Sequence, residues 1–189
     1  MVMRAYIDGC SLTYGHGLPR TQSLSALFND LGGYDVTDLS RPGKSNLAIS
    51  LDTYNNIHDH DVFILGWTYS SRFTLKYQNQ DLDFYVGSHN QGFGIDPQYL
   101  DDAHREVHRY FYTVFSHPFC DQLSDTLVDS TISNLLMKNK KVLAFSWEKR
   151  NIDNELNYPY IPSNQRLPDG HLNFTGMTTL YHYLQNLMQ

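Results

Sequence analysis

One stretch near the start of the chain decides the fold: Ala5-Tyr6-Ile7-Asp8-Gly9-Cys10-Ser11-Leu12-Thr13-Tyr14-Gly15. The apolar run over residues 2–7 predicts a short buried strand that stops at Asp8-Gly9. Ser11 therefore follows a strand and a glycine turn. In sheets of parallel strands, ligands bind beyond the carboxyl ends of the strands, which is where this serine would lie.

Strands and helices alternate along the rest of the chain. Further strands are predicted at residues 34–39, 61–67 and 142–147. Helices are predicted at 21–31, 97–115 and 121–137, from a capping Ser45 or Asn46 to about 56, and at the C-terminal end, where one apolar face holds Met177, Leu180, Tyr181, Leu184, Leu187 and Met188. This order predicts an α/β protein, a three-layer α/β/α sandwich with a mostly parallel central sheet of flavodoxin-like type.

A long segment interrupts this alternation. Residues 73–86 predict either a hairpin or an irregular insertion, and residues 151–168 predict a polar loop. Aromatic residues crowd into an insertion at about 68–100, where they would either pack on the sheet or form a wall against a sugar ester. The length of 189 residues suits one domain over residues 1–189.

Charge and hydropathy argue against two classes of partner. The net charge is −6, and the one basic cluster in the sequence follows a predicted helix, at Lys138, Lys140 and Lys141. Nucleic-acid binding needs clustered lysine and arginine, so no nucleic-acid partner is expected. No apolar run approaches the roughly 20 residues that span a bilayer, so no membrane partner is expected.

The start of the chain and its cysteines bear on localisation. The first apolar stretch begins within a few residues of Met1, which leaves no room for a signal peptide. Cys10 and Cys120 do not make a disulfide framework. These features predict a cytoplasmic protein, and they are also compatible with a virion protein or an unconventional export route. They predict no oligomeric state.

Four short blocks lie in order along nearly the whole chain. They are Gly9-Cys10-Ser11-Leu12-Thr13-Tyr14-Gly15, Arg41-Pro42-Gly43-Lys44-Ser45-Asn46, Gly66-Trp67-Thr68-Tyr69 and Asp169-Gly170-His171. Together they resemble the SGNH hydrolases, also called the GDSL esterase/lipase superfamily. The first, third and last blocks of that family read Gly-Asp-Ser-Leu-Thr-x-Gly, Gly-x-Asn-Asp and Asp-x-x-His, and the second supplies a glycine. The resemblance implies the SGNH hydrolase fold and the hydrolysis of ester bonds.

The resemblance also implies a role for each matching residue. Ser11 would be the nucleophile, His171 the general base and Asp169 the group that orients the imidazole. The backbone N–H groups of Ser11 and Gly43, with a donor at or near Thr68, would bind the oxyanion. No metal or organic cofactor is implied, and the substrate would be a small-molecule or carbohydrate ester.

Three positions depart from the family pattern. Cys10 replaces the usual aspartate and is itself an alternative nucleophile, since thiolates attack well. Thr68 stands in place of asparagine, so the donor is its hydroxyl or a nearby group such as Ser70, Ser71 or Arg72. The spacing from Asp169 to His171 is one residue shorter than usual. Two alternatives therefore stay open: a catalytically idle SGNH-like binding or structural module of a larger assembly, and an O-acyltransferase that uses the same triad.

The nine histidines raise the hypothesis of a metal site. His104 and His108 share one helical face, and His58 and His60 flank Asp59. The order His-Arg-Glu-Val-His is not that of zinc proteases, and no third residue lies at a spacing typical of a metal ligand. Solvated histidines and no metal site are therefore expected.

Overall fold

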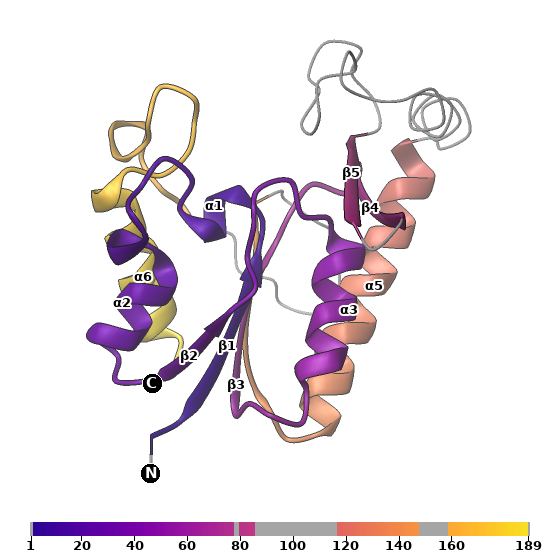
Figure 1. Ribbon diagram of the computed structural model, residues 1–189, viewed down its shortest axis with the longest axis horizontal. Helices are drawn as coiled ribbons and strands as arrows, with labels where there is room; N and C mark the ends of the chain where they lie inside the picture. Colours follow the sequence, from indigo (N-terminus) through magenta and orange to yellow (C-terminus); the bar gives the residue numbers. More distant parts are fainter. Residues whose placement is uncertain (1, 78–79, 86–116, 148–158, 189) are drawn as a thin grey trace.

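The computed structural model describes residues 2–77, 80–85, 117–147 and 159–188. Within them, one parallel sheet has the strand order β2-β1-β3-β6, built from β1 (Arg4–Gly9), β2 (Asp35–Asp38), β3 (Val62–Trp67) and β6 (Lys141–Ser146). Helices α2 (Leu24–Asp30) and α6 (Phe174–Asn186) cover one face of the sheet, and α3 (Asn46–Asn56) and α5 (His117–Met137) cover the other (Figure 1). This arrangement confirms the predicted three-layer α/β/α sandwich.

The central strands bury both of their faces, as a sheet covered on two sides requires. In β1, Ala5 and Ile7 contact the core beneath α2 and α6, whereas Tyr6 lies in the core beneath α3 and α5. In β3, Val62 and Ile64 face the first core, and Phe63 and Leu65 face the second. Successive strand residues point to opposite faces, so a continuous apolar run supplies both cores at once.

Side-chain caps mark where two helices begin, and a proline lies near the start of a third. Ser45 caps α3 by accepting a hydrogen bond from the Ala48 N–H, as the sequence predicts. The helix predicted over 21–31 is divided into a 3₁₀ turn, η1 (Arg20–Gln22), and α2, because Ser23 caps the second part. Helix α5 begins at His117, before the predicted start at 121. Pro118 fits its first turn, where a missing N–H costs no helical hydrogen bond.

Two other elements differ from the prediction at their ends. Strand β1 extends through Asp8 to Gly9, because these residues pair with Leu65 and Gly66 of β3. On α6, the predicted apolar face is buried over Met177, Leu180, Tyr181 and Leu184, whereas Leu187 follows the last helical residue and is exposed.

The segment after β3 is a hairpin. Strands β4 (Arg72–Tyr77) and β5 (Gln80–Tyr85) pair antiparallel, which decides between the two predicted alternatives. The predicted helix at 97–115, the aromatic residues beyond Tyr85 and residues 151–158 of the polar loop lie outside the described residues. The described end of that loop contains the short 3₁₀ helix η3 (Ser163–Gln165).

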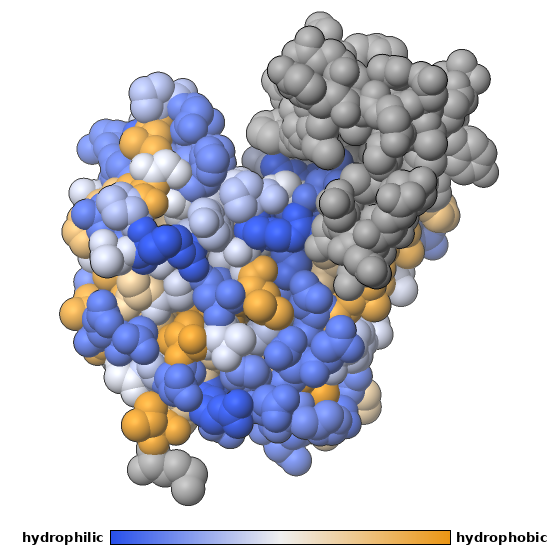
Figure 2. All heavy atoms as spheres, in the orientation of Figure 1, coloured by the Kyte–Doolittle hydropathy of each residue, from blue (hydrophilic) through white to orange (hydrophobic). Residues whose placement is uncertain are grey.

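The surface, the helices and the cysteines add three facts. On the face seen in Figure 2, apolar residues are scattered among polar ones. No helix in the described part of the chain combines the length and the apolar composition needed to cross a bilayer. Cys10 and Cys120 are both buried and free.

Candidate active site

Ser11 lies in the tight turn that follows β1. It begins the one-turn helix α1 (Ser11–Tyr14), and its side chain is largely buried. A Cβ atom at Gly9 would lie 2.8 Å from the carbonyl oxygen of Gly66 and even closer to the side chain of Thr13, so glycine is needed there. This close approach to β3 holds Ser11 at the carboxyl edge of the sheet.

His171 and Asp169 lie in a second tight turn, between η3 and α6. The Leu167 N–H donates to the His171 carbonyl at 2.7 Å, and Gly170 has a φ of 87° in the left-handed region. The His171 N–H donates to Asp169 Oδ1 at 3.1 Å, and His171 Nδ1 lies 3.1 Å from Asp169 Oδ2. The second contact has the distance of an ion pair but not the directionality of a hydrogen bond. The shortened spacing therefore still brings the carboxylate to the imidazole.

The lowered pKa of the Asp169 carboxyl favours its ionised form, which can hold an imidazole in one orientation. The hydrogen bond from the His171 backbone N–H is the main reason that the pKa of the Asp169 carboxyl lies below its ordinary value. An ionised carboxylate beside Nδ1 favours the tautomer that carries its proton there and leaves Nε2 as an acceptor. The ring of His16 packs against the same imidazole, with ring centroids 4.8 Å apart.

Residues from near both ends of the chain line one cleft of about 230 Å³. Its described lining consists of Ser11, Leu12, Tyr69, Arg72, Arg166, Asp169, Gly170 and His171. The structure therefore brings together all three residues of the predicted triad. It adds a tyrosine and two arginines as further walls of the same cleft.

The other two predicted oxyanion residues, Gly43 and Thr68, do not belong to the described lining of this cleft. Gly43 has a φ of 81° in a turn that is tied to β1, because the Arg41 N–H donates to the Gly9 carbonyl at 3.1 Å. Thr68 is fully buried. Its N–H donates to Asn46 Oδ1 at 2.8 Å, and its carbonyl accepts from Asn46 Nδ2 at 3.0 Å. Asn46 thus joins the second block to the third.

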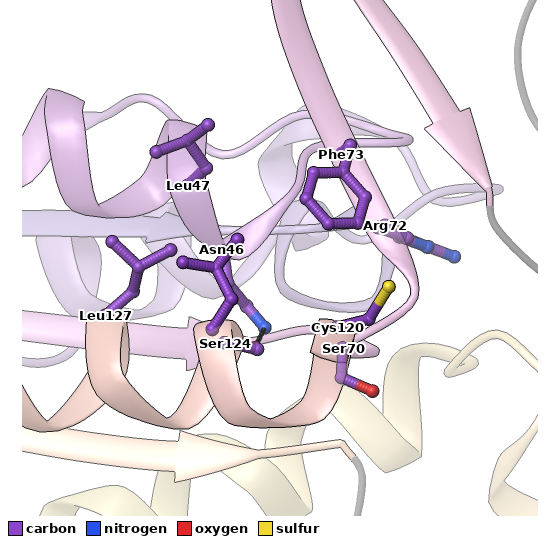
Figure 3. Close-up of a pocket in the computed structure, with 9 residues that line it drawn as sticks. Asn46, Leu47, Ser70, Arg72, Phe73, Cys120, Ser124 and Leu127 are labelled. Atoms are coloured by element: carbon purple, nitrogen blue, oxygen red, sulfur yellow. Dashed lines mark hydrogen bonds between the residues drawn. The ribbon is translucent and has the colours of Figure 1, made fainter. Parts of the chain in front are cut away.

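Among the substitutes predicted for the third donor, Arg72 lines the cleft. Arg72 also lines, together with Ser70, a much smaller cavity of about 10 Å³, whose wall includes Phe73 and Cys120 (Figure 3). In the same view Asn46 donates to Ser124 of α5 at 2.6 Å, so its amide anchors the third block to this helix as well.

The β4–β5 hairpin contacts the second block through Asp83. Asp83 of β5 forms an ion pair with Arg41 and accepts a hydrogen bond from Thr74 Oγ1 at 2.6 Å. A Cβ atom at Gly43 would lie 3.0 Å from Asp83 Oδ2. The positive φ therefore favours glycine at position 43, and a side chain there would also press against Asp83.

A buried charge network surrounds Asp8, three residues before Ser11. Lys44 Nζ contacts both carboxylate oxygens of Asp8 at 2.7 Å and Asp52 Oδ2 at 2.6 Å. Tyr6 donates to Asp8 Oδ2 at 2.7 Å. Burial raises the pKa of Asp8 to about 6 despite the neighbouring ammonium, and burial also raises the pKa of Tyr6.

The histidines of the described region give no sign of a metal site. His60 is buried, with Nδ1 3.1 Å from the Asn56 carbonyl and Nε2 2.9 Å from Thr37 Oγ1. Among the described residues, no three histidine, cysteine, aspartate or glutamate side chains gather as metal ligands. His104 and His108 lie outside those residues.

Sequence reasoning missed the roles of three residues near the triad. Lys44 belongs to the second block, where it reads as an ordinary turn residue. Arg166 precedes the last block, and His16 follows the first, as polar residues of loops. Their only sequence signal is their nearness to a block. Lys44 contacts Asp8 and His16 contacts His171, both in other segments of the chain, whereas Arg166 contacts Gly170 of its own turn.

Comparison with known proteins finds similarity in structure only. No family model matches the chain, and no curated protein matches it. The psychrotrophic esterase EstA from Pseudoalteromonas sp., in a structure inhibited by monoethylphosphonate, matches with a TM-score of 0.52 and 12% identity over 98% of both chains.

Two further solved structures match with lower scores. TesA gives a TM-score of 0.48 and 10% identity over 98% of both chains. A G-D-S-L family protein from Desulfitobacterium hafniense DCB-2 gives 0.43 and 11% over 99% of both chains. At such identities the EstA match shows the fold alone. It agrees with the parallel sheet and its two helical layers, so the chain has the SGNH hydrolase fold.

Proposed function

We propose that this chain is a serine hydrolase of ester bonds, with Ser11 as nucleophile, His171 as general base and Asp169 as the residue that orients the imidazole. One observation carries the proposal. The three residues come from the two ends of the chain and line a single cleft, with the carboxylate 3.1 Å from His171 Nδ1. The fold shared with an esterase agrees with this proposal and does not by itself supply an activity.

The proposed reaction has two stages. Ser11 Oγ attacks the ester carbonyl carbon while its proton passes to Nε2 of His171, and the carbonyl electrons move onto oxygen. The tetrahedral intermediate then expels the alcohol oxygen, which takes that proton. Water attacks the acyl-serine through the same proton transfers, which releases the acid and restores Ser11. The Asp169 carboxylate stabilises the imidazolium that forms in each stage.

The oxyanion requires hydrogen-bond donors beside the nucleophile. We assign this role to the backbone N–H groups of Ser11 and Gly43, with a third donor at or near Thr68. Asn46 supports the assignment, because its amide holds the backbone of Thr68 against the helix that follows Gly43. Removal of one such donor typically costs about 3 kcal/mol of transition-state stabilisation.

Burial supports Ser11 over Cys10 as the nucleophile. Cys10 is fully buried, whereas Ser11 lines the cleft. The substrate in this proposal is a small-molecule or carbohydrate ester, and no metal, organic cofactor, nucleic acid or membrane takes part in the reaction.

Hydrolysis of short acyl esters of p-nitrophenol tests the proposal. Ser11→Ala should reduce kcat by about a thousandfold or more with an unchanged thermal melt, whereas Cys10→Ala should keep most of the activity. The opposite pattern would assign the reaction to the thiol. No hydrolysis above background by the folded wild type would favour the idle module, and an acyl-sugar product in the presence of a sugar acceptor would favour the O-acyltransferase.

A further inference from the structure

The loop after α1 packs against the turn that carries His171. The rings of His16 and His171 are in contact, with their centroids 4.8 Å apart and their planes tilted by 54°. A Cβ atom at Gly17 would lie 2.7 Å from Leu167 Cδ1, at the start of the same turn. The chain after α1 and the loop before α6 lie side by side (Figure 1). The first and the last block are therefore connected through His16 and its neighbour.

The backbone fixes His16 relative to Ser11. The Gly15 N–H and the His16 N–H both donate to the Ser11 carbonyl, at 3.1 and 2.9 Å. Gly15 permits this turn, because its φ of 78° lies in the left-handed region. One residue thus contacts both partners of the proposed proton transfer, through the backbone of Ser11 and the ring of His171.

The Asp169 carboxylate restrains only one edge of the His171 ring. Its contact with Nδ1, at 3.1 Å, lacks the directionality of a hydrogen bond, and the Asp169 side chain is 54% exposed. Such a contact leaves the imidazole able to rotate about its Cβ–Cγ bond, which would turn Nε2 away from Ser11. A second ring packed against the imidazole opposes that rotation, and a separation of 4.8 Å is typical of favourable aromatic pairs.

We infer that His16 is a positioning residue of the active site, whose ring holds the imidazole of His171 with Nδ1 toward Asp169 and Nε2 toward the nucleophile. The inference rests on the proposed ester hydrolysis and adds to it a residue that acts through the general base. The contact is one between two rings, so the site requires the flat shape of the His16 side chain and not a positive charge. A phenyl ring should therefore replace this imidazole, whereas a lysine should not.

The kinetics of p-nitrophenyl acetate hydrolysis test this role. His16→Ala should lower kcat by about tenfold to a hundredfold, because both stages pass a proton through His171 and small displacements of a reacting group are costly. KM should change by less than about threefold, since His16 does not belong to the described lining of the cleft. His16→Phe should restore kcat to within about fivefold of the wild type, and His16→Lys should be as slow as His16→Ala.

His58→Ala is the matched control. His58 is an exposed histidine in the loop before β3, at the amino edge of the sheet, so its removal should leave kcat unchanged. His16 is also exposed, so its variants should melt within about 2 °C of the wild type. Wild-type kcat in His16→Ala, or equal losses in His16→Ala and His16→Phe, would overturn the inference. If His16→Ala does not fold, His16→Lys takes its place in the comparison.

A double-mutant cycle determines whether His16 acts through His171. His171→Ala should keep a residual hydrolysis that depends on the oxyanion donors. In this background His16→Ala should change the residual rate by less than about twofold, because the ring that His16 positions is absent. A loss as large as that in the presence of His171 would assign His16 a separate effect and overturn the inference.

Ring-nitrogen NMR spectra separate this inference from the proposed function, because they require no turnover. With a neutral ring, His171 of the wild type should show one tautomer, with its proton on Nδ1. His16→Ala should show a mixture of both tautomers, and His16→Phe should restore the single one. This pattern in a protein that hydrolyses no ester would refute the proposed reaction and keep the positioning role. Hydrolysis by the wild type, with the same His171 tautomer in His16→Ala, would refute the positioning role and keep the reaction.

Discussion

Lys44 Nζ lies 2.7 Å from both carboxylate oxygens of Asp8, and both side chains are almost fully excluded from solvent. The lysine directly follows Gly43, and the aspartate lies three residues before Ser11 in the chain. The same ammonium donates to the Leu39 carbonyl at 3.0 Å and contacts Asp52 of α3. One buried cation therefore joins strand β1, the second block and helix α3.

Lys44→Met should destabilise the protein most strongly at alkaline pH. The variant leaves the Asp8 carboxylate buried without its cation, which typically costs about 3–5 kcal/mol. At pH 5 the cost should be smaller, because Asp8 can then be protonated. Chemical unfolding at pH 5 and pH 8 measures the difference, with the exposed Lys138→Met as control. An equal loss at both pH values would contradict this account of the pair.

The pKa of Asp8 predicts how wild-type stability depends on pH. Burial raises this pKa from 3.8 to about 6 in the folded state. Between pH 4 and 6 the folded state then holds a proton that the unfolded state has lost, so the free energy of unfolding falls as pH rises. Relative to Asp8→Asn, which cannot titrate there, the wild type should lose up to about 3 kcal/mol over this window. If the free energies of unfolding of the wild type and Asp8→Asn differed by the same amount throughout pH 4 to 6, this would contradict the raised pKa of Asp8.

Asn46 should be needed for both stability and turnover. Asn46→Ala removes the hydrogen bonds to the Thr68 N–H and carbonyl and to Ser124, with an expected loss of about 2–4 kcal/mol. Displacement of the third block by even 1 Å should lower kcat by about tenfold to a hundredfold. Thermal melts and ester hydrolysis measure both effects, with the exposed Asn29→Ala as control. Wild-type values for Asn46→Ala would show that its amide does not position this block.

Asp169→Asn should affect catalysis far more than folding. Asn keeps the size of the side chain but removes the charge beside His171 Nδ1 and permits the wrong tautomer, so kcat should fall by about a hundredfold to ten-thousandfold. The residue is exposed, so the melting temperature should change little. Steady-state kinetics and a thermal melt measure the two effects, and Asp59→Asn, also exposed, is the control. Unchanged kcat would exclude Asp169 as the orienting group.

The layers of the fold were predictable because their signals are local. The run Val62–Trp67 is apolar at every position apart from Gly66, and the face of α6 repeats at helical spacing, so each pattern identifies its element without reference to the rest of the chain. The extension of β1 through Asp8 was not predictable. From the neighbouring residues alone, a charged residue such as Asp8 is expected to end a strand. Its ion-pair partner Lys44 belongs to another segment of the chain.

The candidate site was predictable to a similar extent. Ser11, Asp169 and His171 stand in short blocks whose order is visible in the sequence. The position of Arg72 on the cleft wall depends on where the turn after β3 lies relative to the last block, and no local pattern encodes that distance. The shortened spacing to His171 is acceptable because the turn at Gly170 folds the carboxylate back.

Reaction with a fluorophosphonate tests the central claim most directly. Such a reagent modifies a serine that a neighbouring base activates, and peptide mass spectrometry can assign the adduct to Ser11 or to Cys10. We predict a phosphonyl adduct on Ser11 in the wild type and in Cys10→Ala, and none in Ser11→Ala or His171→Ala. A folded wild-type protein that remains unlabelled, or an adduct that survives in His171→Ala at the wild-type rate, would contradict an activated Ser11.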